Sequence, residues 1–155
     1  MKTKRLGLLL FGAISLTCYF AEAESVSREV CSSSMATELN QSLRVEAEEL
    51  KSFLETRNRR TLSGRDKIEA CSRWSVMGSY AKGMTKFIDS NFQSRPAASM
   101  VEHLQGEIDG NNDCWVKASP QVASMLEGVR IILSRTKRLG ALLSDQGPDD
   151  AERDE

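Results

Sequence analysis

The sequence predicts an all-α protein, a small helical bundle of about four helices with one disulfide. Apolar residues recur every three or four positions in four separate segments, which is the period of an amphipathic helix. No segment shows the alternation of apolar and polar residues that is typical of a half-buried β-strand. The connections between the four segments are short, which favours an up-down bundle.

Residues 1–23 are predicted to be a secretory signal peptide. Basic residues open the chain, an apolar stretch follows over residues 6–20, and Ala21-Glu22-Ala23 is an A-x-A cleavage site. The apolar stretch is too short and too soon followed by charge to span a membrane, and no later stretch is apolar enough. We therefore expect a soluble mature protein, periplasmic or secreted, that begins near residue 24.

The remaining chain divides into a helical domain over residues 24–143 and an acidic tail over residues 144–155. The domain carries 17 basic and 15 acidic residues, a net charge of +2. The tail carries six acidic residues and one arginine, and its composition predicts disorder. A domain so close to neutrality gives no indication of nucleic-acid binding.

The first two helices are predicted over residues 26–57 and 67–89, separated by the turn-forming segment 58–64. The apolar positions of the first are Met35, Leu39, Leu43, Ala47, Leu50 and Leu54. Those of the second, which we expect to be the central helix, are Cys71, Trp74, Met77, Tyr80, Ala81, Met84, Phe87 and Ile88. Ser63 followed by Asp66 resembles a capping box at the start of the second helix.

The third helix is predicted over residues 96–108, with Pro96 at its first position. A polar loop over residues 109–117 follows. Ser119-Pro120 then suits the start of the fourth helix, since serine caps and proline fits the first turn. The inward positions of these two helices are Met100, Val101, Leu104 and Ile108, then Val122, Met125, Leu126, Val129, Ile132, Leu133 and Leu139.

Three cysteines remain once Cys18 is lost with the signal peptide. If the second and third helices form an antiparallel hairpin, Cys71 lies roughly 28 Å from the turn. The third helix and the following loop return roughly 18 Å and 10 Å, which brings Cys114 level with Cys71. We therefore predict a Cys71–Cys114 disulfide. Cys31 is left over, either free or joining two chains in a dimer.

Two glycines and two tryptophans stand out in the predicted bundle. Gly78 and Gly83 each destabilise a helix interior by roughly 1 kcal/mol relative to alanine. A close crossing by a neighbouring helix is the simplest reason for them, and a functional groove is the alternative. Trp74 is predicted to be a core residue. Trp115 is predicted to pack over the disulfide or to be an exposed binding anchor.

No metal, cofactor or catalytic residue is expected. Residues 109–113 resemble the opening of a calcium loop, but Cys114 and Pro120 stand where that loop requires glycine and glutamate. His103 is the only histidine and has no partner histidine for a zinc site. No nucleophile motif accompanies it, so we predict a surface histidine and a protein that is not an enzyme.

Function is therefore expected to reside in a surface that binds another protein. One class is a periplasmic accessory, inhibitor or immunity-type factor, and the alternative is an extracellular four-helix cytokine-like signalling protein. The order of Cys71, Trp74 and Gly78 before Cys114 is faintly similar to amidase immunity proteins. The predicted contact residues are Arg57, Arg59, Arg60 and Trp115.

Two short patterns depend on the host. Arg57-Asn58-Arg59-Arg60 resembles a furin-type processing site in a eukaryotic secretory pathway, and otherwise a cationic helix end. Asn40-Gln41-Ser42 is a glycosylation sequon only where the host glycosylates.

Overall fold

The computed structural model describes residues 25–57, 60–88, 95–110, 114, 117 and 119–144, with side chains from residue 33 onward. It consists of four helices: α2 (Ser25–Glu55), α3 (Gly64–Phe87), α4 (Arg95–Gly110) and α6 (Val122–Ser144). The all-α prediction is confirmed. The first and last residues of each predicted helix differ by at most three positions from those of the observed helix. The predicted signal peptide and most of the predicted acidic tail lie outside the described residues.

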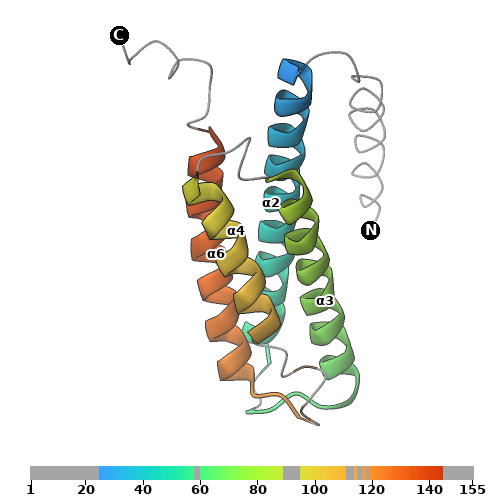
Figure 1. Cartoon of the computed structure of the whole chain (residues 1–155). Coiled ribbons are helices and arrows are strands. Elements are labelled where there is room, and N and C mark those ends of the chain that lie inside the picture. The colour runs from blue at the N-terminus through green and yellow to red at the C-terminus, as the bar shows by residue number, and fades with distance from the viewer. Residues whose placement is uncertain are drawn as a thin grey trace, which may run out of the picture.

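The helices form an up-down-up-down bundle in which each runs antiparallel to the next (Figure 1). α2 packs on α3 and α6, and α4 packs on the same two helices, so the four surround one core. The arrangement brings the last turns of α2 and α4 and the first turns of α3 and α6 to one end of the bundle. That end is called the disulfide end below.

The core is built from the predicted apolar positions of all four helices. Its largest fully buried side chains include Leu43, Leu50, Leu54, Met77, Met84, Leu104, Ile132 and Leu139. Each such side chain stabilises the fold by roughly 1.5–3 kcal/mol on burial. Several predicted inward positions are only partly buried at the margin of the core: Leu39, Tyr80, Phe87, Met100, Leu126 and Leu133.

Covalent and backbone links join the connections at the disulfide end. Cys71 of α3 is bonded to Cys114, with the two Cα atoms 5.2 Å apart, which confirms the predicted pair. Leu62 N–H donates to the Pro120 carbonyl at 2.8 Å. An isolated antiparallel bridge between Thr61 and Gln121 accompanies this bond. The connection after α2 is thereby fixed to the one before α6.

The start of α6 differs from the prediction for a tertiary reason. Ser119-Pro120 was expected to open the helix, but the helix begins at Val122. The Pro120 carbonyl accepts the Leu62 N–H bond, and Val122 N–H donates to the Arg60 carbonyl at 3.2 Å. Pairing with the other connection therefore holds this segment extended where its local sequence favours a helical turn.

The capping box predicted at the start of α3 does not form. Ser63 occupies the N-cap position with extended backbone, but its side chain makes no capping hydrogen bond. The carboxylate of Asp66 lies 3.1 Å from the Nε of Arg57 instead. Gly64 follows with φ of 55°, a conformation that favours glycine. A glycine turn and a cross-connection ion pair thus replace the local cap.

The two helix glycines of α3 meet their neighbours differently. A Cβ atom added at Gly83 would lie 3.2 Å from the Leu39 Cδ1 of α2, which is a tight approach. One added at Gly78 would lie 3.5 Å from the Ile108 Cγ2 of α4, which is ordinary contact. Close helix crossing therefore accounts for Gly83, whereas packing leaves room for a methyl group at Gly78.

We expect Gly78→Ala to raise the free energy of unfolding by roughly 0.5–1 kcal/mol, because alanine restricts the unfolded chain and the added methyl fits. Gly83→Ala is the matched comparison, and its gain should be smaller because Leu39 must move. Urea unfolding of the two variants and the native chain measures both values. A destabilised Gly78→Ala variant would show that α4 approaches α3 more closely than described.

Candidate functional site

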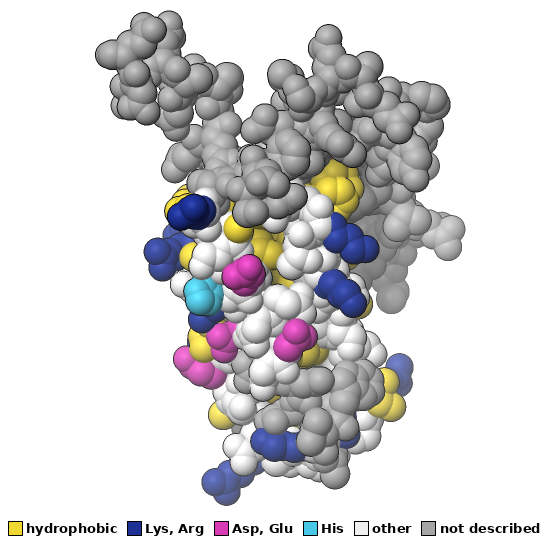
Figure 2. All heavy atoms as spheres, viewed as in Figure 1, with side chains coloured by type: hydrophobic (Ala, Val, Ile, Leu, Met, Phe, Trp, Pro, Cys, Tyr) yellow, Lys and Arg dark blue, Asp and Glu magenta, His cyan; other side chains and the backbone are white. Residues whose placement is uncertain are grey.

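The predicted contact region around Arg57–Arg60 lies at the disulfide end. Two connections that are distant in sequence meet there and carry basic side chains (Figure 2). The described basic residues of this surface, called the basic end below, are Arg57, Arg60, Arg65, Lys67 and Lys117. Asp66 lies among them, and the acidic residues Glu55 of α2 and Asp109 of α4 lie in helix turns at the same end of the bundle. Predicted contacts Arg59 and Trp115 lie outside the described residues.

Arg57 is tied into the bundle. Its guanidinium lies 4.1 Å above the ring of Phe53, which is a cation–π contact. Its Nε faces the Asp66 carboxylate as an ion pair that lacks the alignment of a hydrogen bond. Arg60, by contrast, has an exposed side chain, while its backbone carbonyl accepts the Val122 N–H bond. Arg60 is therefore the better placed of the two to meet a partner.

Lys67 fixes the second connection to the first turns of α3. Its Nζ donates to the backbone carbonyl of Lys117 at 2.8 Å. This bond and the Cys71–Cys114 disulfide fix the second connection to α3, and the backbone bonds Leu62–Pro120 and Val122–Arg60 join it to the first connection. The basic end is thus a fixed surface made from two segments.

Two acidic residues of α2 are paired with an arginine of α3. Arg73 of α3 donates to Glu46 at 2.9 Å and to Glu49 at 2.7 Å, and Glu69 lies within the same cluster. The hydrogen bond that Arg73 donates to Glu49, together with the negative charge of Glu46, raises the pKa of Arg73 above its ordinary value. The cluster links α2 to α3, and the single positive charge of Arg73 offsets part of the negative charge of the three carboxylates.

Asn40, the predicted sequon residue, lies inside the bundle with 6% of its surface exposed. Its Nδ2 donates to the Thr136 carbonyl of α6 at 2.9 Å. Its Oδ1 is buried and has no hydrogen-bond partner among the described residues. Nδ2 is the atom that a glycan would modify, so the folded bundle leaves no room for glycosylation there.

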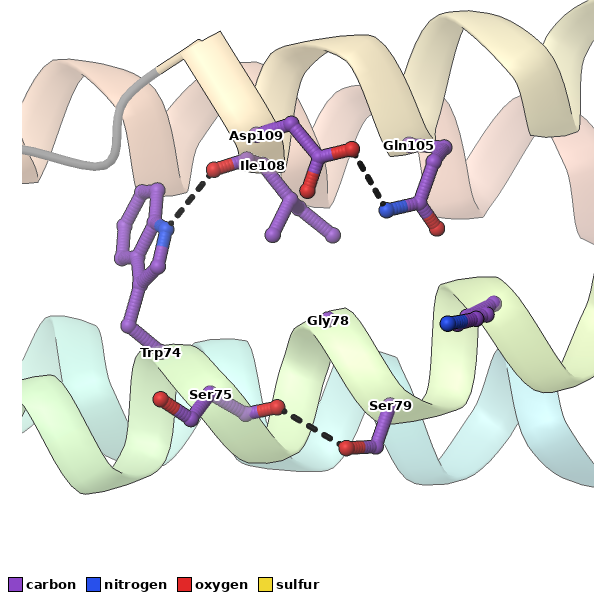
Figure 3. Close-up of a pocket in the computed structure, with 8 residues that line it drawn as sticks. Trp74, Ser75, Gly78, Ser79, Gln105, Ile108 and Asp109 are labelled. Atoms are coloured by element: carbon purple, nitrogen blue, oxygen red, sulfur yellow. Dashed lines mark hydrogen bonds between the residues drawn. The ribbon is translucent and has the colours of Figure 1, made fainter.

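A groove of about 540 Å³ lies between α3 and α4 (Figure 3). It is lined by Trp74, Ser75, Gly78, Ser79, Lys82, Gln105, Ile108 and Asp109. Trp74 is buried as predicted, and its Nε1–H donates to the Ile108 carbonyl at 3.0 Å. This bond joins α3 to α4 beside the groove.

The α4 wall of the groove carries two polar side chains. Gln105 Nε2 donates to Asp109 Oδ2 at 2.9 Å. Gln105 Oε1 is a buried acceptor without a hydrogen-bond partner in the described part of the chain. Sequence reasoning placed Asp109 in a loop and gave Gln105 no role, whereas both lie on α4. Gly78 was the one signal that pointed to this place.

His103 is exposed on α4, as predicted, and its backbone carbonyl accepts a bond from Arg135 at 2.9 Å. Within the described residues, no group of three or more His, Cys, Asp or Glu side chains is placed to hold a metal ion. None of the described helices has the length and apolar character needed to cross a membrane. The side chain of Cys31 lies outside the described residues.

The chain matches no known protein-family model, and comparisons with curated proteins and with solved structures find no significant similarity.

Proposed function

We propose that this chain is an exported helical protein that acts by binding another protein through its basic end. The observation that carries the proposal is the joining of two distant connections into one fixed, positively charged surface. A surface that is already ordered loses little conformational freedom on binding, which favours affinity. Connecting segments held by a rigid scaffold are also where binding residues concentrate.

The charge of the basic end indicates the chemistry of the partner. Five basic side chains lie on the basic end, where the carboxylate of Asp66 already faces Arg57 and that of Glu55, in the last turn of α2, is paired with Lys51. Complementary charge accelerates association and selects partners, so the partner surface should be acidic. Arg60 and Arg65, both exposed, are the side chains best placed to meet it.

The export part of the proposal rests on the signal-like first 23 residues and on the disulfide. Disulfides persist in the periplasm and outside the cell. Of the two classes considered, the bundle topology favours the periplasmic accessory, inhibitor or immunity-type factor. Cytokine bundles run up-up-down-down with two long crossovers, whereas these helices run up-down-up-down. Export is tested by measuring the intact mass of the protein from its native source. The mass should correspond to a chain that begins near Glu24.

Photo-crosslinking in the native host tests the binding surface. A photoreactive residue at position 60 or 65 should yield a crosslinked species, and one at the exposed position 138 of α6 should not. Charge reversal by Arg60→Glu with Arg65→Glu should lower the yield by at least about tenfold, since each close charge contact contributes on the order of 1 kcal/mol. Arg138→Glu is the matched control.

Equal crosslinking from positions 60 and 138 would refute the assignment of the surface. Yields that are insensitive to the double charge reversal would refute its electrostatic basis. The interaction should also weaken as ionic strength rises, because salt screens exposed charges.

A further inference from the structure

We propose that the acidic tail of this chain binds back onto a cluster of unpaired basic side chains at the end of the bundle where α6 ends. That end, called the open end below, lies opposite the disulfide end: α3 and α6 end there, and α4 begins there (Figure 1). The proposal does not depend on the function proposed for the basic end, because it concerns other residues at the other end of the molecule.

Between the two ends of the bundle, basic side chains are paired with carboxylates of the same helix or of a neighbouring one. The described residues paired in this way are Arg44, Lys51, Arg73, Arg130 and Arg135. Each of these positive charges therefore has a negative partner within the bundle itself.

The basic side chains at the open end are exposed and lack such partners. They are Lys82 and Lys86 of α3, Arg95 of α4, and Lys137 and Arg138 of α6. None of the five forms an ion pair or a side-chain hydrogen bond with a described residue. Figure 2 shows Lys and Arg side chains on both flanks of the upper part of the bundle.

Few carboxylates of the bundle are available to these cations. Among the residues whose side chains are described, Glu38 of α2 and Glu102 of α4 are the acidic ones in this half of the bundle. Neither lies within ion-pair distance of a described basic group. The open end therefore carries an excess of positive charge that the described bundle does not offset.

The acidic tail is tethered at the open end. The helix α6 ends at Ser144, and the eleven residues that follow carry six acidic residues and one arginine. A chain of eleven residues without fixed structure has a typical end-to-end distance of about 17–20 Å. Neighbouring helix axes in a bundle lie about 8–10 Å apart. Lys86, in the last turn of α3, and Arg95, the first residue of α4, are therefore within reach.

The same lengths argue against the basic end as the site of the tail within one molecule. The helix α6 spans 23 residues, roughly 34 Å, between the two ends of the bundle. Eleven residues cover about 36–40 Å only when they are fully extended, and full extension removes most conformational freedom. Tethering instead gives the tail a high effective concentration beside the open end.

Complementary charge gives the contact its physical basis. Five unpaired positive charges face a tail whose six acidic residues and one arginine give a net charge of −5. A single exposed ion pair contributes little, but several carboxylates on one tether can exchange among several cations. If the basic end binds an acidic partner as proposed, the bound tail leaves that end as the positive surface that the partner meets.

Zero-length crosslinking of the mature chain tests the contact. A water-soluble carbodiimide joins a lysine amine to a carboxylate where the two groups touch, and peptide mass spectrometry locates the new amide bond. Tail carboxylates should couple to Lys82 and Lys86 at least about tenfold more often than to Lys51, which lies nearer the disulfide end. The coupling should fall at least about threefold in 1 M NaCl, where the screening length is about 3 Å.

Isotope mixing distinguishes a contact within one molecule from a contact between two. Chains of natural isotopic composition are mixed with ¹⁵N-labelled chains before crosslinking. Each crosslinked peptide pair should then be wholly light or wholly heavy. Pairs that join a light peptide to a heavy one in statistical proportion would mean that the tail binds a second copy, and would overturn the proposal.

Two double variants with the same change in charge locate the contact. Lys82→Gln with Lys86→Gln should move the amide NMR signal of Ala151 in the tail toward its position in 1 M NaCl. Arg60→Gln with Arg65→Gln removes the same charge from the basic end and should leave that signal in place. The amide signals of the helices report whether the bundle is intact in each variant.

The proposal is also overturned if the tail couples to Lys82 and Lys86 no more often than to Lys51, or if salt leaves the coupling unchanged. Equal shifts of the Ala151 signal in the two double variants would likewise contradict it, because the tail would then respond to net charge and not to the open end.

Discussion

Replacing Cys71 and Cys114 together by alanine is expected to lower the free energy of unfolding by about 4 kcal/mol. The bond joins residues that are 43 positions apart in the sequence. In the chain-entropy model, closing a loop of that length reduces the entropy of the unfolded chain enough to stabilise the folded state by about 4 kcal/mol. Both side chains are also buried in the core. For a domain of this size the loss corresponds to roughly 10–20 °C in melting temperature. Thermal and urea unfolding measure it.

Reductant provides the control for this variant. It should lower the melting temperature of the native chain toward that of the double variant and leave the variant itself unchanged. If native and variant chains melted together under oxidising conditions, the bond would contribute nothing to stability. The disulfide end would then owe its rigidity to its noncovalent links, which include the Leu62–Pro120 and Lys67–Lys117 hydrogen bonds.

Asn40→Asp is expected to destabilise the bundle by about 3 kcal/mol or more at neutral pH. The new carboxylate would be buried where Nδ2 now donates to the Thr136 carbonyl, so that two acceptors would face each other without a donor. A buried charge with no partner carries a penalty of this order. Gln41→Glu places the same charge on the exposed neighbouring residue and should have little effect.

The pH dependence of this variant has a definite sign. Burial should raise the pKa of the introduced carboxylate above the ordinary value of about 3.9. The folded state then binds more protons than the unfolded state, so stability relative to the native chain falls as pH rises above about 4. Below that pH the deficit should shrink. Urea unfolding of both chains from acid to neutral pH tests it, and a deficit that does not change with pH would argue against a buried carboxylate.

Much of the fold could be predicted because it depends on local periodicity. The recurrence of apolar residues located the four helices, and the fixed rise of a helix was sufficient to pair Cys71 with Cys114. The errors occur where a distant segment competes with a local signal. Pro120 accepts a bond from Leu62, which delays α6, and Asp66 faces Arg57 instead of capping α3.

The candidate sites were less accessible to sequence reasoning. Charge clustering identified Arg57 and Arg60, but the stacking of Arg57 on Phe53 depends on the angle at which the chain leaves α2. Gln105 and Asp109 resemble ordinary polar surface residues in the sequence, and only the pairing of α4 with α3 places them opposite Gly78. Asn40 likewise looks like a surface residue until α6 covers it.

The disulfide and the loop-to-loop bridge restrain one end of the bundle, and this should produce a gradient of local opening along the helices. Sub-global opening is easiest where the fewest links must break, so it should start at the opposite end. Backbone amides should then exchange with solvent more slowly toward the disulfide end. Because neighbouring helices are antiparallel, protection should rise toward the C-terminus of α2 and toward the N-terminus of α3.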